Sequence, residues 1–173
     1  MRFETDRLAL RLENQGDLES LYEMMRDPYT MRFSPRPSPS DEVKGVIEQH
    51  IADDREHGFG LWALLLKKES VFIGQCGISI RHLDGEPLPK IGYPIDNGYW
   101  NNGYATEAVK GGLPYGFETL KLPALFIHTS VKKTPSLRVA QKIGMRQVKE
   151  FEQSIPNPHE TMRHVVFRRA KGE

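Results

Sequence analysis

The sequence contains a single cysteine, Cys76, among its 173 residues, which excludes a disulfide within the chain. No stretch approaches the roughly 18 apolar residues that a membrane-spanning helix needs. The first residues also lack the apolar run of a signal peptide. We therefore expect a cytoplasmic protein that has no membrane partner.

An excess of charge of one sign is missing as well, because 24 lysine and arginine residues face 23 aspartate and glutamate residues. This balance gives no general attraction to nucleic acid, so we expect no nucleic acid partner. The phosphate-binding pattern G-x-x-x-x-G-K-[ST] of nucleotide hydrolases is absent too. A hydrophobic content of 38% can build one buried core, and we expect a single domain over residues 1–173.

The spacing of apolar residues predicts alternating strands and helices. Strands are expected at 5–12, 61–67, 71–81, 90–96, 124–129, 146–154 and 162–169, and helices begin near residues 17, 40, 103 and 134. We expect Asp17 and Thr134 to be N-caps, and His50 to be a packed residue of an apolar helix face rather than a ligand. This order predicts an α+β fold, in which a mixed sheet carries helices on its faces.

Glycine and proline positions predict where elements end or bend. In the helix that follows residue 103, Pro114 lacks a backbone donor and clashes with the preceding turn, so we expect a kink or an end near Gly112. Gly74 and Gly77 inside one predicted strand indicate a bulge or a close backbone approach.

The stretch from Gly92 to Val109 reads G-Y-P-I-D-N-G-Y-W-N-N-G-Y-A-T-E-A-V. It predicts a strand, a tight loop and a helix start. A glycine-rich loop before a helix directs several backbone N–H groups at one place, where the helix dipole adds positive potential. This arrangement suits a phosphate. The alternative is an ordinary connection in which Asn101 or Asn102 caps the helix.

Within this stretch, the pair Gly92-Tyr93 and the run Y-W-N-N-G-Y-A-T-E-A at 99–108 resemble the acyl-CoA-binding motif of the GNAT superfamily of N-acetyltransferases. The runs E-T-D-R-L at 4–8, H-T at 128–129 and S-L-R-V-A-Q-K-I-G-M at 136–145 are similar to the branch of ribosomal-protein N-terminal acetyltransferases. The resemblance covers nearly the whole chain.

The resemblance implies a central, twisted, mostly antiparallel sheet of about seven strands flanked by about four helices. It also implies transfer of an acetyl group from acetyl-CoA to a primary amine by direct attack, without a metal. The acceptor is a protein N-terminus, an amino acid or a small amine. A non-catalytic module that binds acyl-CoA on the same fold is the alternative. A monomer and a homodimer are both open.

In this family the pantetheine arm lies between the strand that ends at Asp96 and the strand that carries His128. A backbone N–H near Ile95 or Asp96 would polarise the thioester carbonyl, and the pyrophosphate would rest on N–H groups of the following loop. The implied cofactor-binding residues are Ile95, Asp96, Trp100, Asn101, Asn102, Gly103, Tyr104, Ala105, Thr106, Lys133 and Ser136.

The chain departs from the family pattern at three positions. Lys133 replaces an asparagine that contacts pantetheine, Ala140 replaces a tyrosine acid, and Lys90 stands where some members carry a glutamate base. We therefore expect Ser136 to protonate the leaving thiolate or to orient the acid, although it can equally help to cap its helix.

Asp96 and His128 are candidates for the general base. Asp96 is equally suited to forming the turn, and His128 to being a buried strand residue. The acceptor site is expected between the first two helices, the loop 31–40 and the final hairpin. Tyr29, Phe33, Phe59 and Trp62 would either line it or belong to the core.

Overall fold

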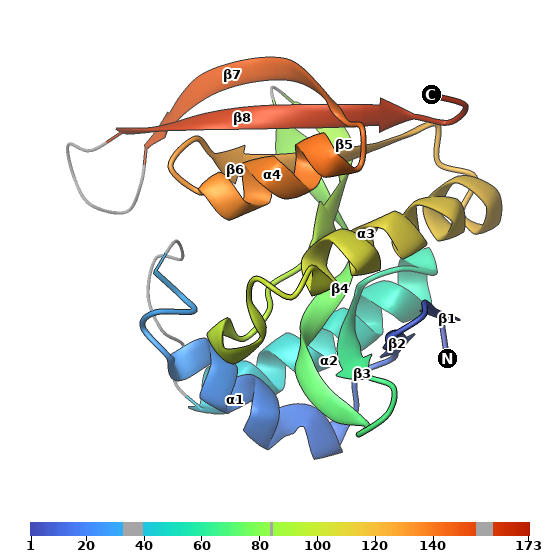
Figure 1. The fold of residues 1–173 in the computed structure, drawn as a ribbon, viewed down its shortest axis with the longest axis vertical. Helices are drawn as coiled ribbons and strands as arrows, with labels where there is room; N and C mark the ends of the chain where they lie inside the picture. Colours follow the sequence, from blue (N-terminus) through green and yellow to red (C-terminus); the bar gives the residue numbers. More distant parts are fainter. Residues whose placement is uncertain (33–39, 84, 155–160) are drawn as a thin grey trace.

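The computed structural model describes residues 1–32, 40–83, 85–154 and 161–173 (Figure 1). Its strands are β1 (Phe3–Glu4), β2 (Leu8–Arg11), β3 (Leu61–Leu66), β4 (Val71–Leu83), β5 (Glu86–Gly92), β6 (Ala124–Ser130), β7 (Arg146–Ser154) and β8 (Thr161–Ala170). Its α-helices are α1 (Leu18–Arg26), α2 (Ser40–His57), α3 (Tyr104–Pro114) and α4 (Thr134–Lys142). Short helical turns cover Gln15–Asp17, Asn97–Tyr99 and Tyr115–Thr119. No helix in these ranges is long and apolar enough to cross a membrane.

The strands form one sheet in the order β1-β2-β3-β4-β5-β6-β8-β7. All neighbours pair antiparallel except β5 and β6, which are parallel and share one residue pair, Lys90 with Phe126. The predicted mixed, mostly antiparallel sheet is therefore confirmed, with the two-residue β1 as an added strand. Beyond Lys90 and Phe126, the two central strands diverge.

Helices cover both faces of the sheet. Phe72 and Ile73 are consecutive in β4 and belong to different apolar clusters, so they mark the two faces. The cluster with Phe72 is built by α1 and α2. The cluster with Ile73 joins α3, α4 and the central strands, and it holds most of the buried apolar side chains. In Figure 1, α3 crosses the middle of the molecule, and α4 lies near β6 and β8.

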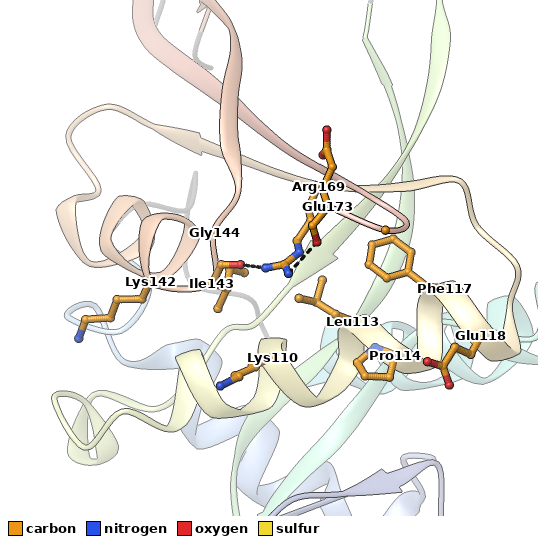
Figure 2. Close-up of a pocket in the computed structure, with 11 residues that line it drawn as sticks. Lys110, Leu113, Pro114, Phe117, Glu118, Lys142, Ile143, Gly144, Arg169 and Glu173 are labelled. Carbon is orange, nitrogen blue, oxygen red and sulfur yellow. Dashed lines mark hydrogen bonds between the residues drawn. The ribbon is translucent and has the colours of Figure 1, made fainter.

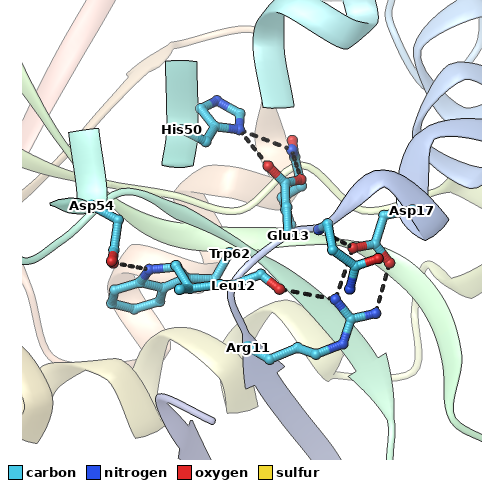
Figure 3. Close-up of polar contacts among 9 residues, drawn as sticks. Arg11, Leu12, Glu13, Asp17, His50, Asp54 and Trp62 are labelled. Carbon is cyan, nitrogen blue, oxygen red and sulfur yellow. Dashed lines mark hydrogen bonds and ion pairs between the residues drawn. The ribbon is translucent and has the colours of Figure 1, made fainter. Parts of the chain in front are cut away.

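The first strand, predicted at 5–12, is shorter in the structure, where β2 covers Leu8–Arg11. Leu8 and Leu10 are fully buried as expected, but Leu12 is 39% exposed and lies beyond the end of β2. Asp17 is the N-cap residue of α1 as predicted, but its side chain makes no cap hydrogen bond. Asn14 caps the preceding turn, and the Asp17 carboxylate accepts from its backbone N–H at 2.9 Å. The carboxylate is held there because it also pairs with Arg11 (Figure 3).

The strand predicted at 90–96 ends early, at Gly92. The chain then turns towards β4, where Gln75 donates its N–H to Pro94 and Asp96 donates its N–H to Ile73. A Cβ at Gly74 would lie 2.4 Å from the Pro94 oxygen, so this approach requires glycine. The prediction of a bulge and a close backbone approach is thus confirmed, and the bulge shifts the register between Leu64 and Leu65.

We expected a kink or an end of α3 near Gly112, and the α-helix passes that residue and ends two residues later, at Pro114. It then widens into a π-helical turn at Tyr115–Thr119. A Cβ at Gly111 would lie 2.6 Å from Thr5 Cγ2, so the glycine lets α3 pack closely on the first strands. Thr134 is the first residue of α4 rather than its N-cap, which is Lys133 and has no side-chain cap bond.

A buried polar cluster lies between α2 and the sheet (Figure 3). The Glu13 carboxylate bonds His50 Nδ1 at 2.7 Å and accepts from the Gln75 amide. The indole N–H of Trp62 donates to Asp54 at 2.9 Å. His50 is therefore a partly buried residue of the α2 face as predicted, but its ring pairs with Glu13 in a polar cluster rather than packing among apolar side chains.

Candidate active site

The N-terminus of α3 presents unpaired backbone donors. Gly103 is the N-cap with a φ of +81°, and no side chain caps the helix. The first backbone bond of the helix runs from Glu107 N–H to the Gly103 carbonyl. The N–H groups of Tyr104, Ala105 and Thr106 therefore point out of the helix end without intrahelical acceptors. This geometry fits an anion such as a pyrophosphate.

The loop before α3 is held by its own side chains. Asn102 donates through its amide to the carbonyls of Tyr99 and Trp100, at 3.2 and 3.0 Å. The Trp100 indole donates to the Ile95 carbonyl at 2.7 Å. Asn101 adopts a left-handed φ of +63°. Because neither asparagine caps α3, the alternative of an ordinary capped connection is wrong, and the helix end stays accessible to a ligand.

Arg7 adds positive charge beside this helix end. Its Nη2 donates to the Asn102 carbonyl at 3.1 Å, and it would lie 3.6 Å from a Cβ at Gly103. The guanidinium lies over the Tyr104 ring at 4.5 Å and pairs with Glu107 at 2.7 Å. The sequence reasoning used Arg7 only as part of a motif and missed this position.

One backbone N–H faces the divergence of β5 and β6. Gly74 and Ile95 form an isolated antiparallel bridge, flanked by the hydrogen bonds to Pro94 and from Asp96. In such a pair the N–H groups of the two bridged residues point away from each other, so the Ile95 N–H is directed away from β4. The Asp96 N–H is already bonded to Ile73 at 3.0 Å. Of the two predicted donors, Ile95 therefore retains the suitable orientation and Asp96 does not.

Ser136 is buried on α4 and contacts a residue that the sequence reasoning did not assign. Its Oγ lies 2.7 Å from the Tyr93 hydroxyl, and either oxygen can donate. Burial raises the pKa of Tyr93, although the bond to Ser136 acts in the opposite direction. Tyr93 therefore stays protonated at neutral pH and can supply a proton through Ser136. The pair joins α4 to the segment that follows β5.

The two candidate bases have different surroundings. The Asp96 carboxylate accepts the Gly98 N–H at 2.8 Å, which makes it a turn former. His128 is half-buried, with its ring 4.8 Å from the ring of His164. Burial and the nearby cations Lys90, His164 and Arg81 lower the pKa of His128 to about 4. The imidazole is therefore neutral at physiological pH.

Lys133 is half-buried at the start of α4, and its N–H donates to the Ser130 carbonyl at 3.0 Å. Burial, then the charge of Arg32, lowers its pKa. The structure thus brings Lys133 and Ser136 to one end of α4, with Tyr93 opposite.

Of the aromatic residues expected near the acceptor, two pack in the core and one lies beside the loop before α3. Trp62 is 1% exposed and packs edge-on against Tyr115, so it belongs to the core. Phe59 also packs against this core. Tyr29 is exposed and its ring lies 5.4 Å from the Trp100 ring, beside the loop. Phe33 lies outside the described residues.

A surface pocket of about 510 Å³ lies at the other end of α3 (Figure 2). It is lined by α3, the π-helical turn, the end of α4 and the C-terminus, and it includes Lys110, Lys142 and Arg169. Figure 2 shows Arg169 directed towards Ile143 and Glu173, whose carbonyls accept its hydrogen bonds. None of the predicted site residues lines this pocket.

Comparisons with known proteins agree with this geometry. The sequence matches the acetyltransferase (GNAT) domain model over residues 7–146. The uncharacterized N-acetyltransferase YnaD of Bacillus subtilis (strain 168) is 30% identical over 161 residues, covering 92% of this chain and 91% of that protein. The acetyltransferase (GNAT family) from Bacillus anthracis superimposes with a TM-score of 0.84 and 26% identity, covering 98% of both chains.

A more distant structure shares the fold alone. RimL, a ribosomal L7/L12 alpha-N-protein acetyltransferase in complex with coenzyme A, has a TM-score of 0.81 at 12% identity, with 96% of this chain and 95% of that chain covered. Since the family model spans most of the sequence and the superposition covers 98% of the chain, the protein belongs to the GNAT family of acetyl-CoA-dependent N-acetyltransferases.

Proposed function

We propose that this enzyme transfers an acetyl group from acetyl-CoA to a primary amine by direct attack of the amine on the thioester. The observation that carries the proposal is the N-terminus of α3, which no side chain caps and whose preceding loop is bonded to the segment that leaves β5 where β5 and β6 diverge. The helix N-terminus suits the pyrophosphate of coenzyme A. The gap between the diverging strands suits its extended pantetheine arm.

The N–H groups of Tyr104, Ala105 and Thr106 would hold the pyrophosphate, and Arg7 would add charge from the side. The loop from Trp100 to Gly103 would shape the approach. Lys133 would lie along the arm, in place of the asparagine found in the family. The same fold is seen in RimL, whose structure contains coenzyme A.

The Ile95 N–H would donate to the thioester oxygen as negative charge develops on it. The amine nitrogen forms a bond to the carbonyl carbon, and the carbon–sulfur bond breaks. Ser136 would give its hydroxyl proton to the leaving thiolate while Tyr93 gives its own to Ser136 through the 2.7 Å contact, and solvent water would then return a proton to Tyr93. The proton released by the amine passes to a base or to water.

Direct attack is favoured over a cysteine-bound intermediate. Cys76 is buried, and burial raises its pKa to about 12, so the thiol stays protonated and unreactive. A non-catalytic module is the second candidate, and the hydroxyl pair of Tyr93 and Ser136, which can relay a proton, favours catalysis over it.

The base requirement is modest, because an α-amino group has a pKa of about 7.7 to 8.0 and is partly neutral at physiological pH. Asp96 and His128 stay the candidates for this role. The Asp96 carboxylate is engaged in its turn, and the lowered pKa of His128 makes the imidazole a weak base.

The test is release of coenzyme A thiol from acetyl-CoA in the presence of amino acids, short peptides and small amines. Thiol release that depends on the amine, with a matching acetylated product in the mass spectrum, would support the proposal. Tight binding of acetyl-CoA without turnover on any amine would favour the non-catalytic module instead.

A further inference from the structure

Three titratable side chains share the sheet face opposite α3 and α4. Lys90 pairs with Phe126, so both point to one face, and His128, two residues on, points the same way. His164 pairs with Ser130, which is two residues from His128 and hence on that face as well. The neighbours Leu125, Ile127, Val165 and Phe167 alternate with these residues and belong to the core that packs against α3 and α4.

Arg81 extends this group across β4 and β5. It lies two residues from Ser79, which pairs with Lys90, so its side chain starts from the same face. We call Arg81, Lys90, His128 and His164 the acceptor-side cluster. It flanks the divergence of β5 and β6 on the side away from Ser136.

The cluster contains two cations, the exposed Arg81 and the partly buried Lys90, beside two partly buried histidines. Burial, then the charges of Arg81 and Lys133, lowers the pKa of Lys90 to about 8. Burial and the charge of Lys90 also lower the pKa of His164. Every neighbouring charge that shifts the pKa values of Lys90, His128 and His164 is a cation.

The two histidines also carry unused polar atoms. In the part of the chain that the structure describes, His128 Nε2 and His164 Nδ1 are buried and have no hydrogen-bond partner. Phe151 closes the group, with its ring 5.3 Å from His128 and 5.9 Å from His164. A buried polar atom without a partner is costly, and a ligand that bonds to it recovers that cost.

We propose that the acceptor-side cluster binds an anionic group of the acceptor, a carboxylate or a phosphate, and so selects amines that carry a negative charge. The inference rests on the acetyl transfer proposed above. An anion among these residues offsets the repulsion between the cations and accepts hydrogen bonds from the Lys90 ammonium and a histidine N–H. The amine of the same molecule then lies towards the strand divergence, where the thioester is expected.

The first experiment compares matched pairs of acceptors: 3-aminopropanoate with 3-aminopropanamide, and 2-aminoethyl phosphate with ethanolamine. We expect a larger kcat/KM for at least one anionic member, and the better of the two identifies carboxylate or phosphate. In Lys90→Met the ratio of anionic to neutral kcat/KM should fall by about tenfold or more, because one partner of a charged contact is lost. Lys110→Met, an exposed lysine on α3, is the control and should keep the parental ratio.

The second experiment does not need turnover. The C2–H proton resonances of His128 and His164, assigned with His128→Asn and His164→Asn, are followed while propanoate, inorganic phosphate or neutral propanamide is added. We expect propanoate or phosphate to shift both resonances and to raise both histidine pKa values, and propanamide to leave them unchanged.

The two experiments separate the inference from the function on which it rests. If anions shift the histidine resonances but no amine is acetylated, the anion site stands and the acetyl transfer fails. If amines are acetylated but neutral acceptors are used equally well, or neither anion shifts the resonances, the inference is overturned and the acetyl transfer stands. An unchanged ratio in Lys90→Met also contradicts it.

Discussion

The Thr5 hydroxyl donates a 2.6 Å hydrogen bond to Glu107 Oε1, and so joins the segment before β2 to the first turn of α3. Glu107 also accepts from the Arg7 backbone N–H at 2.9 Å and from Arg7 Nε at 2.7 Å. Two motif segments that lie about 100 residues apart are therefore one structural unit. This unit fixes the helix end at which the pyrophosphate is proposed to bind.

Glu107→Gln should lower the free energy of unfolding by about 1 to 2 kcal/mol at pH 7, because hydrogen bonds to a charged acceptor are weakened. Burial alone would raise the pKa of Glu107, but the bonds from Thr5 and Arg7 outweigh it and the pKa is lowered. The stabilisation is therefore present above the ordinary value of 4.5 and is lost as the pH falls through the lowered one. Urea unfolding of both proteins at pH 7 and pH 3 measures this difference, and an equal difference at both values would contradict the charge contribution.

Gly103→Asp should weaken binding of coenzyme A by at least tenfold, because it places a negative charge at the proposed pyrophosphate site. Gly103→Asn is the matched control, since it has nearly the same shape and the same positive φ without the charge. Calorimetry on folded samples measures both affinities. Equal affinities for the two variants would show that charge at this helix end has no part in binding.

Ser136→Ala should lower kcat by about 10-fold to 100-fold while the affinity for acetyl-CoA is kept, because coenzyme A thiolate is a good leaving group and needs only moderate acid assistance. Tyr93→Phe should have a similar effect, and the double variant should be little worse than either single one if the two hydroxyls act as one chain. Steady-state kinetics and thermal unfolding on the same samples separate the outcomes. Loss of stability without loss of kcat would mean that Ser136 only stabilises the start of α4.

The dependence of kcat/KM on pH should rise with the fraction of neutral amine and show no step between pH 5 and pH 7. With a pKa of about 4, His128 is already neutral throughout this range, so its titration adds nothing there. Profiles for His128→Asn and Asp96→Asn, measured with an acceptor of known pKa, should keep this shape. A step near pH 6.5 that disappears in His128→Asn would make His128 the base.

The elements themselves were largely predictable, because the apolar period fixes which residues face the core. The errors arose where a distant contact decides the local structure. Segment 93–96 has the composition of a strand, yet it turns away from β5. It can do so because Gly74 has no side chain, and the Pro94 backbone can therefore approach β4 closely. α3 passes Gly112 because that end of the helix packs closely against β1, where glycine is needed. The strand and helix propensities of these two segments carry no information about either contact.

Only the part of the site whose residues lie close together in the sequence was predictable. The Asn-Gly loop and the helix start lie within one stretch, so the sequence alone was enough to predict a helix start at Gly103 and to propose an anion site there. Tyr93 and Ser136 are 43 residues apart, and Arg7 and Asn102 are 95 apart, so their contacts needed the fold. The joint occurrence of the segments that hold Arg7 and Glu107 was the one signal in the sequence that could have indicated their pairing.

The single residue pair between β5 and β6 has a mechanical consequence. A ladder of seven pairs joins β6 to β8, and another joins β4 to β5, whereas only Lys90 and Phe126 join β5 to β6. A force that pulls the two halves of the sheet apart therefore meets its least backbone resistance at this seam. There the halves hold together through side-chain packing, such as that of Ile91 and Ile127 in the shared core. A ligand that lies along the seam and contacts both halves acts as a clamp, so the enzyme should be hardest to pull apart while it holds its substrate.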